Sequence, residues 1–392
     1  MFEGIDHLPS RLHRWIAVSL LAAVTLPASA CDDTLDDDDA LPLELRSATP
    51  GASSIDALGP GDGETWAVLP DGSLKGWGQR YCTTAGGCPA PAAIAPVVLP
   101  GPAVDVRSNG QVAMALMADG TVLSLGSTVA DTLAPQPVSW PDAVTELALG
   151  ADFVCGRLDD GTVPCQALDG VPAPAWLAGY EPVGNAVEVV AGSHHACART
   201  TGQSVVCWGD NAVGQLGSTA AAGLTPIPLS DAAQQLAAGA GHTCALLSDA
   251  TVECWGDDAE GQRGHDQPGV GSVTPLGPIT QITAGAEHTC ALGSNRAHLY
   301  CWGSNALGQL GISAEVTGGI HRVDLGGLLA VEVMAGPTAW TTFALFEGAG
   351  LRGWGHDDVH QTGYGDLFDG KPQSAHMVGN LPDILVLDVS EE

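Results

Sequence analysis

The segment AGAGHTCALLSDATVECWGDDAEGQRG, residues 238–264, occurs in two further close copies. These are AGSHHACARTTGQSVVCWGDNAVGQLG at residues 191–217 and AGAEHTCALGSNRAHLYCWGSNALGQLG at residues 284–311. The tryptophans of the three copies, Trp208, Trp255 and Trp302, are each 47 residues apart. A fixed period in the forties is typical of repeat architectures, in which one unit buries its apolar face only against its neighbours.

Weaker copies of this unit occupy much of the remaining chain. From the first unit to the seventh, the tryptophan position holds Trp77, Leu125, Gln166, Trp208, Trp255, Trp302 and Trp354. Turn dipeptides such as Asp71-Gly72 and Asp119-Gly120 separate short apolar runs, because glycine adopts positive φ at little cost. Runs with proline, such as residues 225–229, suit an outer strand, since proline donates no ladder hydrogen bond.

These patterns predict an all-β fold, a seven-bladed β-propeller of four-stranded antiparallel blades. The chain holds 52 glycines and 26 prolines, enough for the many turns, and has no long helical period outside its N-terminus. We assign residues 54–392 to the propeller. Its blade cores are expected at about residues 55–80, 103–128, 144–169, 186–217, 233–264, 279–311 and 329–365. The apolar run 384–389 could add a strand to the first or the last blade.

The repeat pattern G-x-x-H-T-C-A-L followed by V-x-C-W-G-x-N-x-x-G-Q-L-G resembles that of the regulator of chromosome condensation family. Asn211, Gly214, Gln215, Leu216 and Gly217 match the second half of the pattern, as do Asn305, Gly308, Gln309, Leu310 and Gly311. The resemblance implies a seven-bladed propeller. Eukaryotic members of the family bind chromatin and act as exchange factors on a small GTPase, and one similar bacterial protein inhibits β-lactamases. Function does not follow from the fold alone.

The first 53 residues read as an export signal and a tether. Arg11 and Arg14 precede an apolar run that ends in Ala-Ser-Ala before Cys31, as in a bacterial lipobox, although Ala28 stands where leucine is usual. We expect residues 1–30 to be a signal peptide and Cys31 to carry a lipid anchor, with simple cleavage after Ala30 as the alternative. Residues 31–53 hold an acidic run typical of a disordered tether. The protein is thus expected in the bacterial cell envelope, or secreted.

The chain is strongly acidic, with 45 acidic and 13 basic residues and a formal net charge of −32. Such a surface disfavours nucleic acid and anionic lipid, and it tolerates cationic partners. We therefore expect no nucleic-acid partner, contact with a membrane only through the lipid anchor, and a monomer. An exchange-factor or chromatin role fits neither export nor this charge.

The chain has 11 cysteines, and after Cys31 the other ten form pairs. Four pairs place one cysteine on each arm of a predicted hairpin, within disulfide range: Cys155 with Cys165, Cys197 with Cys207, Cys244 with Cys254, and Cys290 with Cys301. Cys82 and Cys88 lie in one loop insertion and form the fifth predicted bridge. Zinc is the rival interpretation, but the C-x-x-C spacing of structural zinc sites is missing.

Two groups of residues are candidates for a metal or a catalytic centre. His195, His242 and His288 occupy one repeat position, which Glu64 fills in the first unit and Ala339 in the last; their simpler role is to hydrogen-bond a neighbouring loop. His356, Asp358 and His360 depart from the repeat loop of the last unit and could bind a divalent cation. A solvated acidic loop is the simpler interpretation there, and we expect neither a metal nor a cofactor.

The functional hypothesis is a non-enzymatic scaffold that presents propeller loops to a protein or glycan. Loop aromatics are common anchors of binding faces, and five lie outside the core pattern: Tyr81, Trp140, Trp176, Tyr180 and Tyr364. Some of them would instead pack against the blade edges. One alternative is a glycan hydrolase or lyase with a site at the channel mouth, including Glu64 and His288. Another is an inhibitor of an exported enzyme. No common catalytic fingerprint is present.

Overall fold

The computed structural model describes residues 57–78, 95–127, 135–217, 224, 226–313, 316, 318–347, 350–357 and 361–362. Compactness divides the chain into Met1–Ala48 and Thr49–Glu392, and every described residue belongs to the second unit. The signal segment, the tether with Cys31, the Cys82–Cys88 pair and residues 384–389 lie outside the described residues. No helix in the described part is long and apolar enough to span a bilayer.

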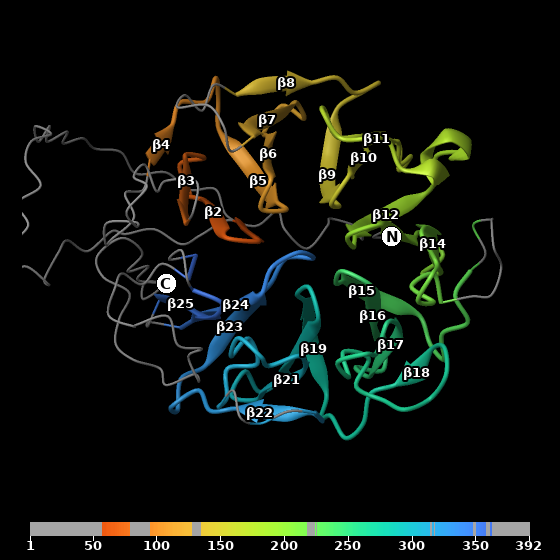
Figure 1. Cartoon of the computed structure of the whole chain (residues 1–392), viewed down its shortest axis with the longest axis vertical. Helices are drawn as coiled ribbons and strands as arrows, with labels where there is room; N and C mark the ends of the chain where they lie inside the picture. Colours follow the sequence, from red (N-terminus) through yellow and green to blue (C-terminus); the bar gives the residue numbers. More distant parts are fainter. Residues whose placement is uncertain are drawn as a thin grey trace, which may run out of the picture. The chain divides into compact units, whose positions relative to one another are not determined.

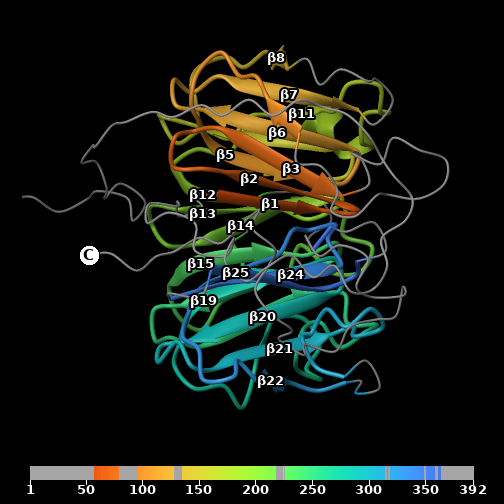
Figure 2. The same cartoon turned by 90° about the vertical axis from the view of Figure 1, so that its left-hand side faces the viewer.

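The described strands form seven antiparallel sheets, which follow one another around a common centre (Figure 1). This confirms the predicted all-β propeller. The side view shows the sheets stacked as successive blades (Figure 2). The strands of the first three blades are β1 (Ala57–Gly61), β2 (Glu64–Val68), β3 (Leu74–Gly78) and β4 (Ala95–Val97); β5 (Ala103–Ser108), β6 (Val112–Met117), β7 (Val122–Ser127) and β8 (Gln136–Val138); and β9 (Val144–Leu149), β10 (Phe153–Leu158) and β11 (Cys165–Ala167).

The other four blades repeat this order. They contain β12 (Ala186–Ala191), β13 (His195–Thr200) and β14 (Val205–Gly209); β15 (Ala233–Ala238), β16 (His242–Leu247), β17 (Val252–Gly256) and β18 (Gly271–Ser272); β19 (Ile279–Ala284), β20 (His288–Gly293), β21 (Leu299–Gly303) and β22 (His321–Val323); and β23 (Ala330–Met334), β24 (Thr341–Phe346) and β25 (Gly350–Gly355). A short 3-10 helix, η3 (Ala175–Gly179), follows the third blade.

Four blades have four strands and three have three within the described residues, so the expected four-stranded blade is not uniform. In the third and fourth blades the outer position is reduced to isolated bridges, Val163 with Val183 and Val206 with Pro226. Prolines beside these bridges, Pro164 and Pro226 among them, remove donors that a longer ladder would need.

The hydrophobic core lies between blades rather than within them. One cluster joins Cys254 and Val252 of the fifth blade to Ile282 and Trp302 of the sixth. Another joins Phe343 and Leu351 of the last blade to Leu58 and Trp77 of the first, and this packing closes the ring. Because each blade covers its neighbour's apolar face, no single repeat has a core of its own.

Disulfides join the second and third strands in four successive blades, from Cys155–Cys165 to Cys290–Cys301, with Cα–Cα distances of 4.0–4.1 Å. Each links residues directly opposed in the register, as in Cys244 opposite Cys254. Blades without a bridge pair a large residue with a small one there: Trp66 with Gly76, Met114 with Ser124, and Phe343 with Gly353. A Cβ at Gly353 would collide with the Phe343 ring, so the small partner makes room for the large one.

Candidate interaction face

The turns between the first and second strands lie at one end of the propeller, which we call the rim, and a series of backbone hydrogen bonds joins five of them. Ala151 N–H donates to the Ser193 carbonyl at 2.8 Å, and Ser193 N–H to Ala240 at 3.1 Å. The series continues from Ala240 to Ala286 at 2.9 Å and from Ala286 to Ala339 at 2.8 Å. Five successive blades are thus tied backbone to backbone, and the side chains on their turns are held on a rigid base.

A second set of contacts, the latch, fastens four of the seams beneath the rim, from the seam between blades four and five to the one that closes the ring. The carbonyl of the repeat-loop glutamine accepts the indole N–H of the next blade's tryptophan: Trp255 to Gln215, Trp302 to Gln262 and Trp354 to Gln309, at 2.9–3.0 Å. The ring closes in the same way, because Gln361 after the last blade accepts from Trp77 at 3.0 Å and from Thr65 at 2.8 Å in the first. The repeated Gln and Trp residues therefore join blades.

The three repeated histidines belong to this latch. Their Nε2 atoms lie 2.7–2.8 Å from threonine hydroxyls of the following blade: His195 to Thr243, His242 to Thr289, and His288 to Thr342. Thr289 and Thr342 donate to the Gln262 and Gln309 carbonyls, so they accept from a protonated Nε2. Burial lowers the pKa of His195 to about 4 and those of His242 and His288 to about 3, and the rings are neutral. They are built into seams as structural groups.

The register corrects the sequence alignment in the last blade. Thr341 lies opposite Gly355, as His288 lies opposite Gly303, so Thr341 and not Ala339 holds the histidine position. The rim turn of that blade, residues 336–340, is two residues longer than residues 285–287 of the sixth blade. The insertion adds Trp340 to the rim, where its indole is half-buried. The alignment treated the two segments as equal in length and therefore missed this tryptophan.

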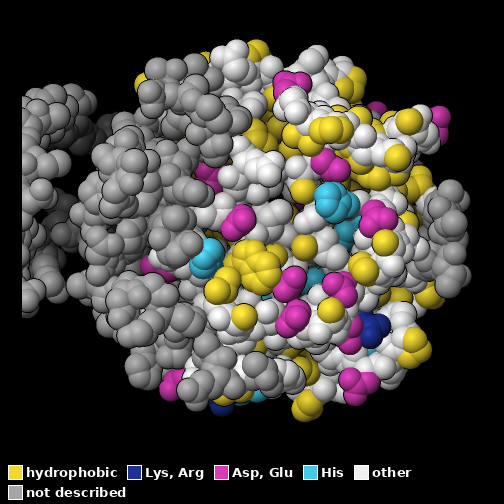
Figure 3. Space-filling model, viewed as in Figure 1, with side chains coloured by type: hydrophobic (Ala, Val, Ile, Leu, Met, Phe, Trp, Pro, Cys, Tyr) yellow, Lys and Arg dark blue, Asp and Glu magenta, His cyan; other side chains and the backbone are white. Residues whose placement is uncertain are grey.

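Carboxylates lie on the rim turn next to that of Trp340 and on the repeat loop of the fifth blade. Glu287 lies on the turn whose Ala286 bonds to Ala339, and its pKa is raised by partial burial and by the nearby Glu260 and Asp257. These three carboxylates form none of the ion pairs of the described residues, whereas the nearby Arg263 is paired with Asp258 at 2.9 Å. On the face drawn in Figure 3, acidic and hydrophobic side chains gather around the centre and few Lys or Arg side chains are in view.

The predicted aromatic anchors have packing roles where the structure describes them. Trp176 packs edge-on against Phe153 at 5.0 Å between ring centroids, and Tyr180 stacks on Trp208 at 5.4 Å. The Tyr180 hydroxyl donates to the Val163 carbonyl at 2.6 Å. Trp140 packs, partly buried, against the core between the second and third blades. Tyr81 and Tyr364 lie outside the described residues.

The structure brings none of the candidate metal or catalytic residues into a described centre. His356 follows the last blade, with its backbone N–H on the Trp340 carbonyl at 3.0 Å, whereas Asp358 and His360 lie outside the described residues. Within the described part, no three His, Cys, Asp or Glu side chains are placed to hold a metal. Glu64 and His288 are both buried in seams, Glu64 accepting from Ser108 and His288 bonded to Thr342.

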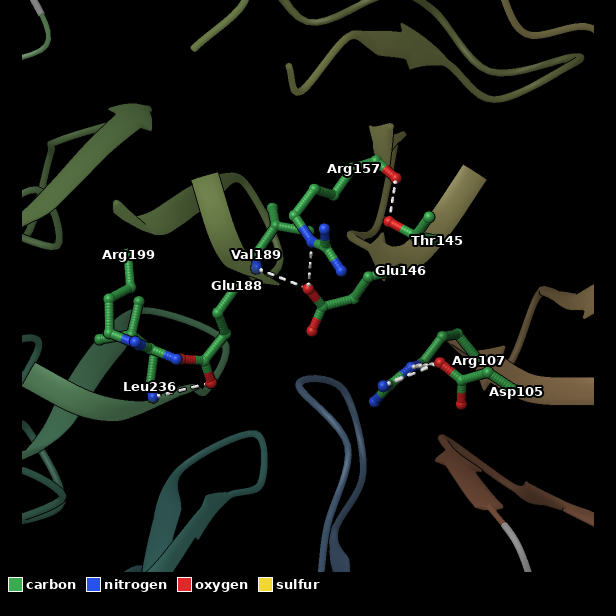
Figure 4. Close-up of polar contacts among 9 residues, drawn as sticks. All are labelled: Asp105, Arg107, Thr145, Glu146, Arg157, Glu188, Val189, Arg199 and Leu236. Carbon is green, nitrogen blue, oxygen red and sulfur yellow. Dashed lines mark hydrogen bonds and ion pairs between the residues drawn. The ribbon is translucent and has the colours of Figure 1, made fainter. Parts of the chain in front are cut away.

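Within the blades, a third set of contacts joins neighbouring inner strands. The third residue of the inner strand, the clip position, follows a β-bulge in blades two to seven and holds Asp105, Glu146, Glu188, Gln235, Gln281 and Glu332. Glu146 accepts from Val189 N–H at 3.1 Å and Glu188 from Leu236 N–H at 3.0 Å, each in the next blade (Figure 4). Bulges redirect side chains, and here they direct the clip across the seam.

Comparison with known proteins agrees with this architecture. The family model described as "Regulator of chromosome condensation (RCC1) repeat" matches residues 186–215, 233–262 and 279–309. The chain carries RCC1 repeats. The matched repeats are blades four, five and six, which supply the histidine and the glutamine of the latch at the seam that follows each of them. A comparison with curated protein sequences gives no match.

Solved structures similar to this RCC1-repeat propeller show the same fold. Yeast RCC1 (Prp20), in its complex with Kap60, is 17% identical, with a TM-score of 0.58 over 71% of this chain and 78% of that chain. Human WBSCR16 is 18% identical, with a TM-score of 0.60 over 73% of this chain and 85% of that one. The CRINKLY WD40 ectodomain of the Arabidopsis thaliana receptor kinase ACR4 is 20% identical, with a TM-score of 0.51 over 82% and 97%. At these identities the likeness concerns the fold alone.

Proposed function

We propose that this RCC1-repeat propeller is an exported, non-enzymatic scaffold that binds a cationic segment of a protein partner on its rim. The observation that carries the proposal is that Trp340 lies on a rim turn hydrogen-bonded to the turn of Glu287, a carboxylate with Glu260 and Asp257 nearby. An aromatic face attracts Lys and Arg by cation–π interaction, and the carboxylates supply the opposite charge. A rigid base reduces the entropy lost on binding.

The comparisons support a binding role in general terms. One similar structure is yeast RCC1 (Prp20) bound to Kap60, and a second study of Prp20p describes its binding properties to Gsp1p and histones. Those partners belong to those proteins. For this chain, the signal segment and Cys31 favour a partner in the cell envelope or outside the cell, and the overall charge of −32 favours a basic one.

The test is crosslinked capture from the envelope and secreted fractions of the producing cell, followed by mass spectrometry. We expect a saturable protein partner with a basic contact segment, lost with Trp340→Ala and weakened by Glu260→Gln/Glu287→Gln. Matched controls at the opposite end of the blades are Val331→Ala, at an exposed valine, and Asp159→Asn, at an exposed carboxylate. Equal capture by rim and control variants would contradict the proposal.

The same material distinguishes the alternatives. If the captured partner is an exported enzyme whose activity falls on binding, the protein is an inhibitor. If the ligand is a glycan, neutral oligosaccharides should compete with its binding. Added salt should leave that binding unchanged, because few ion pairs would be involved. Turnover of a glycan that one substitution abolishes would establish the hydrolase or lyase hypothesis.

A further inference from the structure

The seam between the third and fourth blades is built differently from the later seams. Trp208 stands at the latch position of the fourth blade, but its indole Nε1 is buried without a hydrogen-bond partner. The third blade has Phe153 where the following three blades have histidine, and the fourth has Ala196 opposite Trp208 where the fifth and sixth blades have threonine. This seam therefore lacks the latch and depends on other contacts.

Several polar contacts remain across this seam. At the rim, Ala151 N–H donates to the Ser193 carbonyl, and His194 Nδ1 lies 3.4 Å from Asp152 Oδ2. At the opposite end, Ala186 N–H donates to the Gly161 carbonyl at 2.8 Å, and between the two ends Glu146 on β9 accepts from Val189 N–H on β12. Between them are apolar and aromatic contacts of Phe153 and Trp208. Because the latch is missing, the clip at Glu146 makes up a larger fraction of the polar contacts across this seam than the clips of the latched seams do.

The fifth and sixth blades show what a complete clip looks like. Gln235 accepts from Ile282 N–H at 2.9 Å and donates to the Ile282 carbonyl at 3.1 Å. Gln281 makes the same two bonds with Val333, at 2.9 Å and 3.2 Å. An ionised glutamate has no proton to donate, so the carboxylate of Glu146 makes the first bond only.

In blades three to six, the residue opposite the clip on the neighbouring strand differs between glutamine and glutamate clips. Glutamine clips lie opposite leucines, Gln235 opposite Leu246 and Gln281 opposite Leu292. Two of the glutamate clips lie opposite arginines that bond them: Arg157 Nε to Glu146 at 3.1 Å, and Arg199 Nε to Glu188 at 2.8 Å. The third, Glu332, lies opposite Leu345. The chain therefore contains an uncharged and a charged version of one contact.

The charged groups that act on Glu146 come from three neighbouring strands. Burial and the Glu188 carboxylate on β12 raise the pKa of Glu146 to about 7, against the opposing effects of Arg157 on β10 and Arg107 on β5. Arg107 is itself bonded to Asp105 at 3.0 Å, with Glu332 of the last blade also acting on it. Close to neutral pH, both forms of Glu146 are populated.

We propose that Glu146 is a proton-operated clip: on protonation its carboxylic O–H donates to the Val189 carbonyl, completing the two-bond contact that Gln235 and Gln281 make permanently. A proton from solvent is taken up, and the seam between blades three and four tightens in mildly acidic surroundings. The inference is independent of the proposed binding role of the rim. Its sign follows from linkage, because a carboxyl with a raised folded-state pKa stabilises most below its unfolded value and loses that contribution as pH rises to the folded value.

The test is hydrogen exchange of backbone amides in the folded, oxidised chain between pH 5 and 8, corrected for intrinsic rates. We expect the opening constant of the Val189 amide to rise by up to about tenfold per pH unit between 4.5 and 7, and then to level off. The Ile282 amide, which donates to Gln235, is the internal control, and its opening constant should not change with pH. The double variant Glu146→Gln/Arg157→Leu reproduces the Gln235–Leu246 pair of the fifth blade. In this variant the opening constant of the Val189 amide should no longer depend on pH.

A parallel response of Val189 and Ile282 in the wild type would overturn the proposal, as would pH dependence of Val189 that persists in the double variant. Carbon-13 titration of the Glu146 carboxyl supplies a measurement that needs no variant. A midpoint near neutrality, with the Val189 carbonyl shift following it, supports the clip. A midpoint at or below 4.5, or an unresponsive Val189 carbonyl, refutes it.

Discussion

Replacing Thr289 by valine should show how much one latch contributes to holding the ring together. The hydroxyl accepts from His242 Nε2 at 2.8 Å and donates to the Gln262 carbonyl at 3.0 Å. Valine has nearly the same shape, so packing is kept and only the polar contacts are lost. Gln262 keeps its bond from Trp302, whereas the His242 N–H remains buried without an acceptor. One such orphaned donor costs about 1–3 kcal/mol.

The assay is chemical denaturation at pH 7.5 with the disulfides intact. We expect Thr289→Val to lower the free energy of unfolding by about 2 kcal/mol. Thr251→Val is the control, because that hydroxyl bonds Asp249 on an exposed turn, and its change should stay within about 0.5 kcal/mol.

The seam without a latch suggests a second variant that tests the same contact. Between the third and fourth blades, Phe153 and Ala196 occupy the positions of His242 and Thr289. The pair His242→Phe/Thr289→Ala imitates that seam, so its cost should be smaller than the sum of the two single changes. A Thr289→Val loss below about 0.5 kcal/mol, or strictly additive single changes, would refute the idea that the hydroxyl connects the two blades.

Three more outcomes follow from the structure. Cys290→Ser/Cys301→Ser should lower stability by roughly 2–3 kcal/mol, the contribution expected of a short-loop disulfide, and reduction of the wild type should lower it further because four described bridges open; calorimetry with and without reductant measures both. In Glu146→Gln/Arg157→Leu, stability should decline as pH falls from about 6.5 toward 4, because unfolding lets three buried histidines with lowered pKa values take up protons; a level profile in denaturant titrations would contradict their neutral role. Trp340→Ala, at a half-buried rim position, should change the melting temperature far less than Trp302→Ala, which empties a fully buried site at a cost of about 3–5 kcal/mol; thermal scans of both variants decide this.

The proposed binding site was harder to predict than the fold, and particular residues show why. Loop position suggested Trp140, Trp176 and Tyr180 as anchors, but these side chains pack against the blades next to them. Trp340 was not among the predicted anchors, because a two-residue insertion in the rim turn shifts the last repeat against the others. Which aromatic ring reaches solvent depends on how neighbouring blades meet, and a repeat pattern does not contain that information.

Sequence by itself determined the period, the seven units, the hairpin pairing of eight cysteines and the all-β class, because these depend on local alternation, turns and spacing within one unit. Only the tertiary structure decided what the repeated residues do. The roles of His242, Gln262 and Trp302 arise between units, where a carbonyl of one blade meets donors of the next. The closure of the ring by Gln361 on Thr65 and Trp77 joins residues almost 300 positions apart, as the separations of 296 and 284 show. Contacts of that kind are set by the packing of blades around a common centre, and no local pattern encodes them.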